Sequence, residues 1–201
     1  MYYGNATGKM QMSILGAEKT PISVGPPNSQ FGMPVSPTIT FDEYRKLAKT
    51  GFKKGKGVEK GAIDVLLVPG GGGTRGDMSR EIEFVKEVYP SLEYIISVCT
   101  GSTILARAGV LDNKHATTNK RAWAWATTFG TNTTYQLGRW VKDGNTYSTS
   151  GVSAGGDGTL GFISDVYGEG VAQYVSDSAE WTRWTNASSD PFAERWGVVA
   201  K

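Results

Sequence analysis

The chain of 201 residues contains one cysteine, Cys99, and one histidine, His115. A single thiol excludes an intramolecular disulfide framework, and the two residues together exclude metal sites built from several thiolates or imidazoles. An excess of one charge is also missing, because 21 basic and 19 acidic residues leave a net charge of +2. This balance gives no general electrostatic reason to bind nucleic acid. Any catalytic chemistry must therefore rely on few side chains.

Long hydrophobic runs are absent as well, so we expect no segment to span a bilayer. No basic segment followed by an apolar one opens the chain, so we expect no signal peptide and a cytoplasmic protein. The apolar share of 39% is nevertheless sufficient for a folded core. We expect residues 1–201 to form one domain that carries a basic, glycine-containing insertion loop near residues 45–60.

Strand and helix patterns alternate along the chain. Residues 63–68 and 94–98 are short, nearly continuous apolar runs, which are typical of strands buried on both faces of a parallel sheet. The spacing predicts a helix over residues 79–89, with Ser79 as its N-cap. Further helices are expected at residues 101–108, 159–167 and 171–184, and a hairpin around residues 142–145. The pattern predicts an α/β three-layer sandwich with a mostly parallel sheet.

Cys99 directly follows the second of these strands, and a helix of small residues begins at Gly101. Sites in open α/β sheets lie at the carboxyl ends of strands, and the N–H groups at a helix start favour a thiolate. The segment has the pattern of a nucleophile elbow with cysteine in place of serine. The alternative is that Cys99 is a buried small hydrophobic residue, the commonest state of a free cysteine.

The first strand ends in Pro69 and four glycines, residues 70–73. Glycines let backbone amides approach a ligand closely, so one of these amides is a candidate partner for the Thr100 amide in an oxyanion hole. A Walker-type phosphate loop is excluded, because no Lys-Ser or Lys-Thr pair follows at the required spacing. The alternative is an ordinary glycine-rich turn between a strand and a helix.

Four ordered segments between about residues 63 and 192 resemble the ThiJ/PfpI superfamily of flavodoxin-like, class I glutamine amidotransferase-like proteins. These segments are residues 64–71, residues 97–101, residues 108–112 with 116–118, and residues 150–155 with Asp157. The pairing of Val-Cys-Thr-Gly with Ala-Thr-Thr is similar to the isonitrile hydratase-like branch. In that branch a cysteine adds to the terminal carbon of an isonitrile, and water then releases an N-formamide without a metal or organic cofactor.

The resemblance assigns roles to individual residues. It implies that Cys99 is the nucleophile and that the amides of Gly71 and Thr100 polarise the substrate, with the Thr100 hydroxyl as a further donor. The substrate pocket would be lined by Gly70, Val152 and Asn119. Asp157 is expected to cap the helix that follows it and to have a structural role near the site.

The sequence departs from the family pattern at two points. Relatives begin with a hydrophobic strand and a helix that supply an acidic residue beside the cysteine. We expect this first strand and its acid to be missing here, with Glu18 only a weak substitute. Several relatives also carry a histidine where this chain has Asn119, and His115 is expected on the surface, so a Cys–His dyad is poorly supported.

These departures leave other functions open beside the hydratase. One is a glyoxalase-like enzyme acting on 2-oxoaldehydes, and another is a degenerate homologue that acts as a non-enzymatic redox sensor through Cys99. For the hydratase we expect a small-molecule substrate, a homodimer, no cofactor or metal, and neither nucleic acid nor membrane as a partner.

Overall fold

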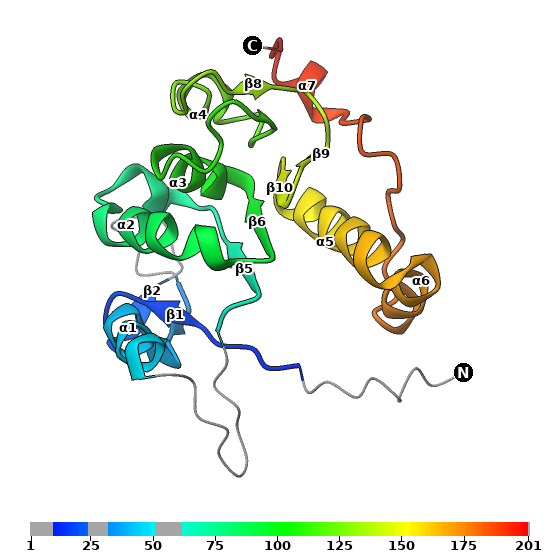
Figure 1. Ribbon diagram of the computed structural model, residues 1–201. Helices are drawn as coiled ribbons and strands as arrows, with labels where there is room; N and C mark the ends of the chain where they lie inside the picture. Colours follow the sequence, from blue (N-terminus) through cyan, green and yellow to red (C-terminus); the bar gives the residue numbers. More distant parts are fainter. Residues whose placement is uncertain (1–9, 24–31, 51–61, 201) are drawn as a thin grey trace. The chain divides into compact units, whose positions relative to one another are not determined.

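The computed structural model describes residues 10–23, 32–50 and 62–200. The chain divides into two compact units, residues 1–63 and residues 64–201, each of which is described by itself (Figure 1). The expectation of one domain over the whole chain stays a prediction. Within the described residues, no helix is both long enough and apolar enough to cross a membrane.

The first unit contains short strands and one helix. Strand β1, Leu15–Gly16, pairs in parallel with β4, Ile39–Thr40. Strand β2, Ile22–Ser23, pairs antiparallel with β3, Pro34–Val35. These pairings are only two residues long, so the helix supplies most of the regular structure in this unit.

Helix α1, Phe41–Thr50, occupies the first part of the stretch that we expected to be an insertion loop. Thr40 and Glu43 form a capping box, in which the Glu43 N–H donates to the Thr40 hydroxyl (3.1 Å) and the Thr40 N–H donates to the Glu43 carboxylate (2.9 Å). Phe41 and Tyr44, three residues apart, are both buried. The loop prediction was wrong for residues 45–50, because the basic composition outweighed this start signal in our interpretation. Residues 51–60 lie outside the described residues.

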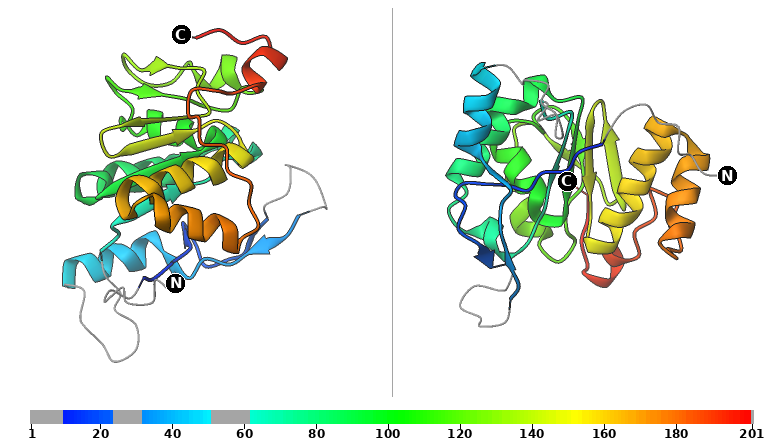
Figure 2. Two further views of the ribbon diagram at one scale, coloured as in Figure 1. Left: turned by 90° about the vertical axis from the view of Figure 1, so that its right-hand side faces the viewer. Right: turned by 90° about the horizontal axis from the view of Figure 1, so that it is seen from below.

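The second unit contains a four-stranded sheet with helices on both faces (Figure 2). The strands, in sheet order, are β5 (Val65–Val68), β6 (Tyr94–Val98), β10 (Thr146–Thr149) and β9 (Trp140–Asp143). Strands β5, β6 and β10 are parallel, and only β9 runs antiparallel to its neighbour. The three-layer α/β sandwich with a mostly parallel sheet is therefore confirmed.

Two helical layers cover this sheet. One contains α2 (Ser79–Val88) and α3 (Ser102–Arg107), and the other contains α5 (Val152–Tyr167) and α6 (Glu169–Ser178) (Figure 2). The smaller elements are η1 (Gly72–Arg75), η2 (Tyr89–Ser91), η3 (Cys99–Gly101), β7 (His115–Ala116), α4 (Trp123–Ala126), β8 (Thr134–Tyr135) and α7 (Phe192–Arg195).

Aromatic packing fixes α5 on the sheet. Phe162 of α5 meets Tyr94 of β6 and Tyr147 of β10 edge to face, with ring centroids 5.1 and 5.4 Å apart. Ile96 completes this buried cluster. Aromatic pairs of this geometry add stabilisation beyond the burial of their apolar area. They hold the helix against the two strands whose ends build the site.

The start of α2 differs from the prediction by one position. Ser79 is the first helical residue, not the cap, because the Asp77 carboxylate accepts the Ser79 N–H (2.9 Å) and also bonds its hydroxyl. These hydrogen bonds hold the pKa of Asp77 below its ordinary value. The N-cap position belongs to Met78, one residue earlier than we placed it, and the Asp77 carboxylate holds the first helical residue.

Helix α5 begins at Val152 rather than at the expected residue 159, so glycines that indicated a turn are helical. A Cβ on Gly155 would lie 2.7 Å from a methyl of Val98, and one on Gly158 would lie 2.6 Å from the Thr149 methyl. The glycines let the helix backbone approach β6 and β10 more closely than any side chain would permit. Helix α6, in turn, ends at Ser178, before the expected end at residue 184.

Gly158→Ala is expected to destabilise the protein by about 1–3 kcal/mol, because the added methyl overpacks the contact with Thr149 and Trp140. In an open helix the same change would stabilise by about 0.5–1 kcal/mol. Urea unfolding measures the difference. The control is Gly73→Ala, whose methyl meets no described atom within 4 Å. A Gly158→Ala protein as stable as wild type would contradict the close packing.

Candidate functional site

Cys99 lies where β6 ends and the turn η3 begins, and the chain continues directly into α3. Its φ of +58° is in the left-handed region that residues with a side chain rarely adopt. Such strain costs about 1–3 kcal/mol and persists only where the surroundings enforce it. The residue is partly exposed. The strained turn agrees with the nucleophile elbow predicted from the sequence, and the alternative of a fully buried cysteine was wrong.

Two glycines allow this turn to sit against the end of β5. A Cβ on Gly101 would lie 2.3 Å from the Val68 carbonyl oxygen, and a Cβ on Gly70 would lie 2.6 Å from the Thr100 nitrogen. Both contacts are backbone to backbone, so neither could be relieved by a side-chain rotation. The missing Cβ of Gly70 lets the end of β5 pack directly against the Thr100 nitrogen. The Thr100 N–H is one of the first N–H groups of the turn and has no acceptor within it.

Two buried hydroxyl groups hold the Cys99 carbonyl. The Ser102 Oγ lies 3.1 Å from the Cys99 oxygen, and the Thr118 Oγ1 lies 3.4 Å from it. The two hydroxyls are 2.8 Å apart and belong to residues with 0% exposure. Because buried hydroxyls require partners, this network fixes the peptide that follows the cysteine.

The amide of Gly71, which we expected to polarise a substrate, donates to the Thr100 hydroxyl oxygen at 2.9 Å. That hydroxyl is buried and also lies 3.0 Å from the Thr74 hydroxyl. The Gly71 amide and the Thr100 side chain are thus occupied with each other in this structure. The expected pair of oxyanion donors is reduced to the backbone N–H of Thr100.

Asn119 and Val152 both lie next to Gly151, the N-cap residue of α5. The Asn119 Oδ1 accepts the N–H of Ala122 at 3.1 Å, and its Nδ2 is the nearest atom to the Cβ position of Gly151, at 3.9 Å. Val152 is the first residue of α5 and is 83% exposed. With Val98 it lines an apolar groove, whose other large apolar residues are Leu67, Leu160, Ile163, Val175 and Trp181.

Asp157 lies inside α5, so the expected capping role was wrong; the N-cap position belongs to Gly151. Its carboxylate accepts hydrogen bonds from Arg139 (2.6 and 2.8 Å), from the Trp181 indole (2.8 Å) and from the Trp184 amide (3.1 Å). The pair with Arg139 is buried. Asp157 therefore fastens the segment after α6 onto α5.

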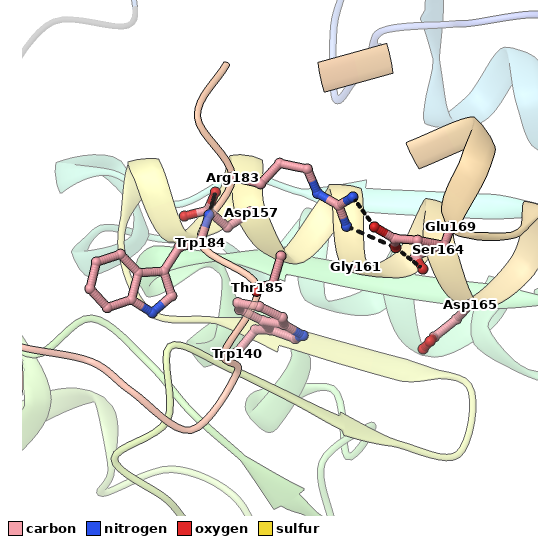
Figure 3. Close-up of a pocket in the computed structure, with 9 residues that line it drawn as sticks. All are labelled: Trp140, Asp157, Gly161, Ser164, Asp165, Glu169, Arg183, Trp184 and Thr185. Carbon is pink, nitrogen blue, oxygen red and sulfur yellow. Dashed lines mark hydrogen bonds and ion pairs between the residues drawn. The ribbon is translucent and has the colours of Figure 1, made fainter. Parts of the chain in front are cut away.

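A polar pocket beside Asp157 is separate from the cysteine (Figure 3). It is lined by Trp140, Asp157, Gly161, Ser164, Asp165, Glu169, Arg183, Trp184 and Thr185. Arg183 pairs with Glu169 at 2.5 Å, and Lys142 pairs with Asp165 at 2.9 Å. Hydrogen bonds from Arg183 and Ser164 hold the pKa of Glu169 below its ordinary value. The three carboxylates that line this pocket are therefore all engaged in ion pairs with neighbouring segments.

His115 lies on the surface, as expected. Its backbone N–H donates to the Asp143 carboxylate at 2.8 Å, and its Nδ1 lies 3.2 Å from the same oxygen. The first of these bonds is the main reason why the pKa of Asp143 lies below its ordinary value. The ring is thus engaged away from Cys99, while Glu18 belongs to the first unit. In the described part of the chain, no three His, Cys, Asp or Glu residues gather as metal ligands would.

Sequence reasoning considered Ser102 only as a small residue that permits the tight turn, and it assigned no role to Thr118 or Lys120. Thr118 belonged to a motif used only for the resemblance, and nothing in its neighbourhood indicated that its hydroxyl would reach the Cys99 carbonyl. Lys120 is a lysine with only 2% exposure, which no periodicity had suggested. A buried lysine needs partners from elsewhere in the chain, and the sequence alone did not reveal them.

Thr100→Val is expected to lower the free energy of unfolding by about 1–3 kcal/mol, because the Gly71 N–H loses its acceptor while the side-chain volume is kept. Amide hydrogen exchange at Gly71 should become faster in this variant and stay slow in Thr100→Ser, which keeps the hydroxyl. A Gly71 amide that exchanges equally fast in wild type and Thr100→Val would show that this bond is not made in solution.

Comparison with known proteins places this geometry in context. Residues 15–163 match the family model of the DJ-1/PfpI family. Isonitrile hydratase from Pseudomonas putida is 32% identical over 159 residues, which cover 78% of this chain and 61% of that protein. The chain therefore spans less than two thirds of the length of this curated relative.

Solved structures show the same fold. A ThiJ/PfpI family protein from Pseudomonas syringae has a TM-score of 0.65 and 24% identity, covering 90% of this chain and 65% of that one. DJ-1beta of Drosophila melanogaster has a TM-score of 0.54 and 20% identity, covering 75% and 74%. These matches confirm the flavodoxin-like architecture that the four motifs indicated. The chain is a member of the DJ-1/PfpI family.

Proposed function

We propose that this protein is a cysteine-dependent hydratase that converts isonitriles to N-formamides. The observation that carries the proposal is the strained, partly exposed Cys99 at the end of β6. The 32% identity to an isonitrile hydratase supports this reaction over others that use the same fold. The reaction needs a nucleophile, a proton and water, and neither a metal nor an organic cofactor forms part of the proposal.

The chemistry runs in two additions. The Cys99 thiolate forms a carbon–sulfur bond to the terminal isonitrile carbon, and that carbon takes up a proton to give a thioimidate. Water then adds to the same carbon, and the nitrogen is protonated. The hydroxyl proton then returns to solvent as the carbon–sulfur bond breaks, which releases the N-formamide and returns the thiolate. The sum is one isonitrile and one water in, and one N-formamide out.

The residues around Cys99 have defined parts in this proposal. The Thr100 N–H, which directly follows Cys99 in the turn η3, stabilises charge on the adduct. Solvent supplies the proton, which is consistent with the partial exposure of Cys99. The groove at Val98 and Val152 offers an apolar surface to the substituent of the isonitrile. The homodimer and the cytoplasmic location stay predictions within the same proposal.

A redox sensor is the second candidate function. It is favoured by the hydrogen bond between Gly71 and Thr100, because that bond leaves fewer donors for a substrate than a hydratase would use. Cys99 alone suffices for reversible oxidation to a sulfenic acid. The glyoxalase alternative gains no comparable support, since His115 is bound to Asp143.

A turnover assay with a simple alkyl isonitrile distinguishes these functions. The wild-type protein should produce the N-formamide, and Cys99→Ser should lower the rate at least about 100-fold, because a hydroxyl is a far weaker nucleophile than a thiolate. His115→Asn is the control and should retain wild-type turnover. Formation of the product is followed by NMR.

Two outcomes would overturn the hydratase. One is turnover that survives in Cys99→Ser, which would separate the reaction from the cysteine. The other is an inactive wild type whose Cys99 is oxidised by peroxide and recovered by a thiol, as the sensor requires. A 2-oxoaldehyde assayed in parallel tests the glyoxalase alternative.

A further inference from the structure

Lys120 is a buried cation that the proposed chemistry does not use. Its side chain is 1% exposed, and its Nζ lies 3.2 Å from the Asp190 carboxylate, whose side chain is 0% exposed. The Nζ also donates to the Thr117 hydroxyl and to the Gly138 carbonyl, both at 2.9 Å. Burial lowers the pKa of Lys120, and the nearby Asp190 acts in the opposite direction. A buried charge is tolerated only with such partners.

Asp190 brings the C-terminal segment to this lysine. Its other carboxylate oxygen accepts the N–H of Phe192 at 3.0 Å, at the start of α7. A second contact follows nearby, because the Trp123 indole N–H donates to the Val199 carbonyl at 2.9 Å. The C-terminal segment is thus fastened to the chain just after the Thr-Thr motif at two points.

The residues that Lys120 binds also contact the cysteine turn. Besides its bond to Thr117, the Lys120 Nζ lies 3.4 Å from the Thr118 carbonyl. The Thr118 hydroxyl, on the same residue, reaches the Cys99 carbonyl. Asn119 lies between the two and places its amide beside Gly151. One ammonium therefore sets the position of the residues that support the strained turn and flank the start of α5.

We propose that Lys120, neutralised by Asp190, is a positioning residue for Cys99: it holds residues 117–119 so that Thr118 keeps the cysteine turn in its left-handed conformation. The proposal rests on the proposed function of Cys99 as the reactive group. Lys120 acts through Thr117 and Thr118 and touches no reacting atom. A pair of apolar residues would fill the same space at lower cost, but they would not fix the loop by hydrogen bonds.

The reactivity of Cys99 measures this positioning directly. Cys99 is the only thiol in the chain, so the rate of alkylation by iodoacetamide reports this residue alone. Lys120→Met should lower the rate at least about tenfold and change its pH profile, whereas Lys120→Arg should restore part of it. Isonitrile turnover is measured in parallel, with kcat expected to fall more than KM rises.

Further variants guard against a loss of folding. Lys120→Met leaves the Asp190 carboxylate buried and unpaired, so the double variant Lys120→Met/Asp190→Leu removes both charges together. Asp190→Asn keeps the acceptor for the Phe192 N–H and removes only the charge. Arg139→Met is the matched control, because it breaks another buried pair in the same unit, and the Arg139 side chain bonds to Asp157 and Ser153 of α5.

The outcomes separate this proposal from the hydratase. Slower alkylation in the folded Lys120 and Asp190 variants, at a wild-type rate in Arg139→Met, supports positioning. Alkylation at or above the wild-type rate in the folded double variant overturns it, and so does an equal loss of rate in Arg139→Met, which would indicate general destabilisation. If wild type fails to hydrate isonitriles, the proposed function fails, while the alkylation comparison still decides the role of Lys120.

Discussion

The end of β5 and the turn after β6 pack backbone against backbone, and this contact constrains the turn that holds the cysteine. Gly101 faces the Val68 carbonyl and Gly70 faces the Thr100 nitrogen, at distances that leave no space for a Cβ. The bond between the Gly71 amide and the Thr100 hydroxyl joins the same two segments. Cys99 keeps a positive φ because it lies in the turn held by these contacts and by the hydroxyls of Ser102 and Thr118. Cys99 is therefore positioned by the packing of two strand ends.

The sequence pattern predicted those elements whose structure depends on residues close together in the chain. The bounds of β6 agree with the prediction, since a short, mostly apolar run that contains Ile95, Ile96 and Val98 indicates a buried strand without reference to its partners. The position of Cys99 followed from the same reasoning. The glycines of α5 were misinterpreted because their meaning depends on Val98 and Thr149, which are distant in sequence. The capping box at Thr40 and Glu43 was visible in the sequence and was overlooked. The pairing of Lys120 with Asp190 could not have been predicted, because nothing near either residue identifies the other.

Two buried ion pairs join separate segments of the second unit. Arg139 and Asp157 tie the segment after α6 to α5, while Lys120 and Asp190 tie the last part of the chain to the Thr-Thr motif. Buried pairs contribute little net stability compared with apolar packing, but they specify which segments meet. In this protein both pairs bind parts of the chain after α6, and Lys120 of the second pair also bonds to Thr117 beside the cysteine turn. The family match covers residues 15–163, which include the sheet and the cysteine turn. The C-terminal segment lies outside this match.

The packing of α5 on β6 also bears on how such sequences diverge. The methyl groups of Val98 fill the space where a side chain at position 155 would otherwise begin. Residues 98 and 155 therefore share one fixed volume, and a gain at one of them has to be matched by a loss at the other. Homologous chains that carry alanine at position 155 should have a smaller residue at position 98, so the two positions would covary.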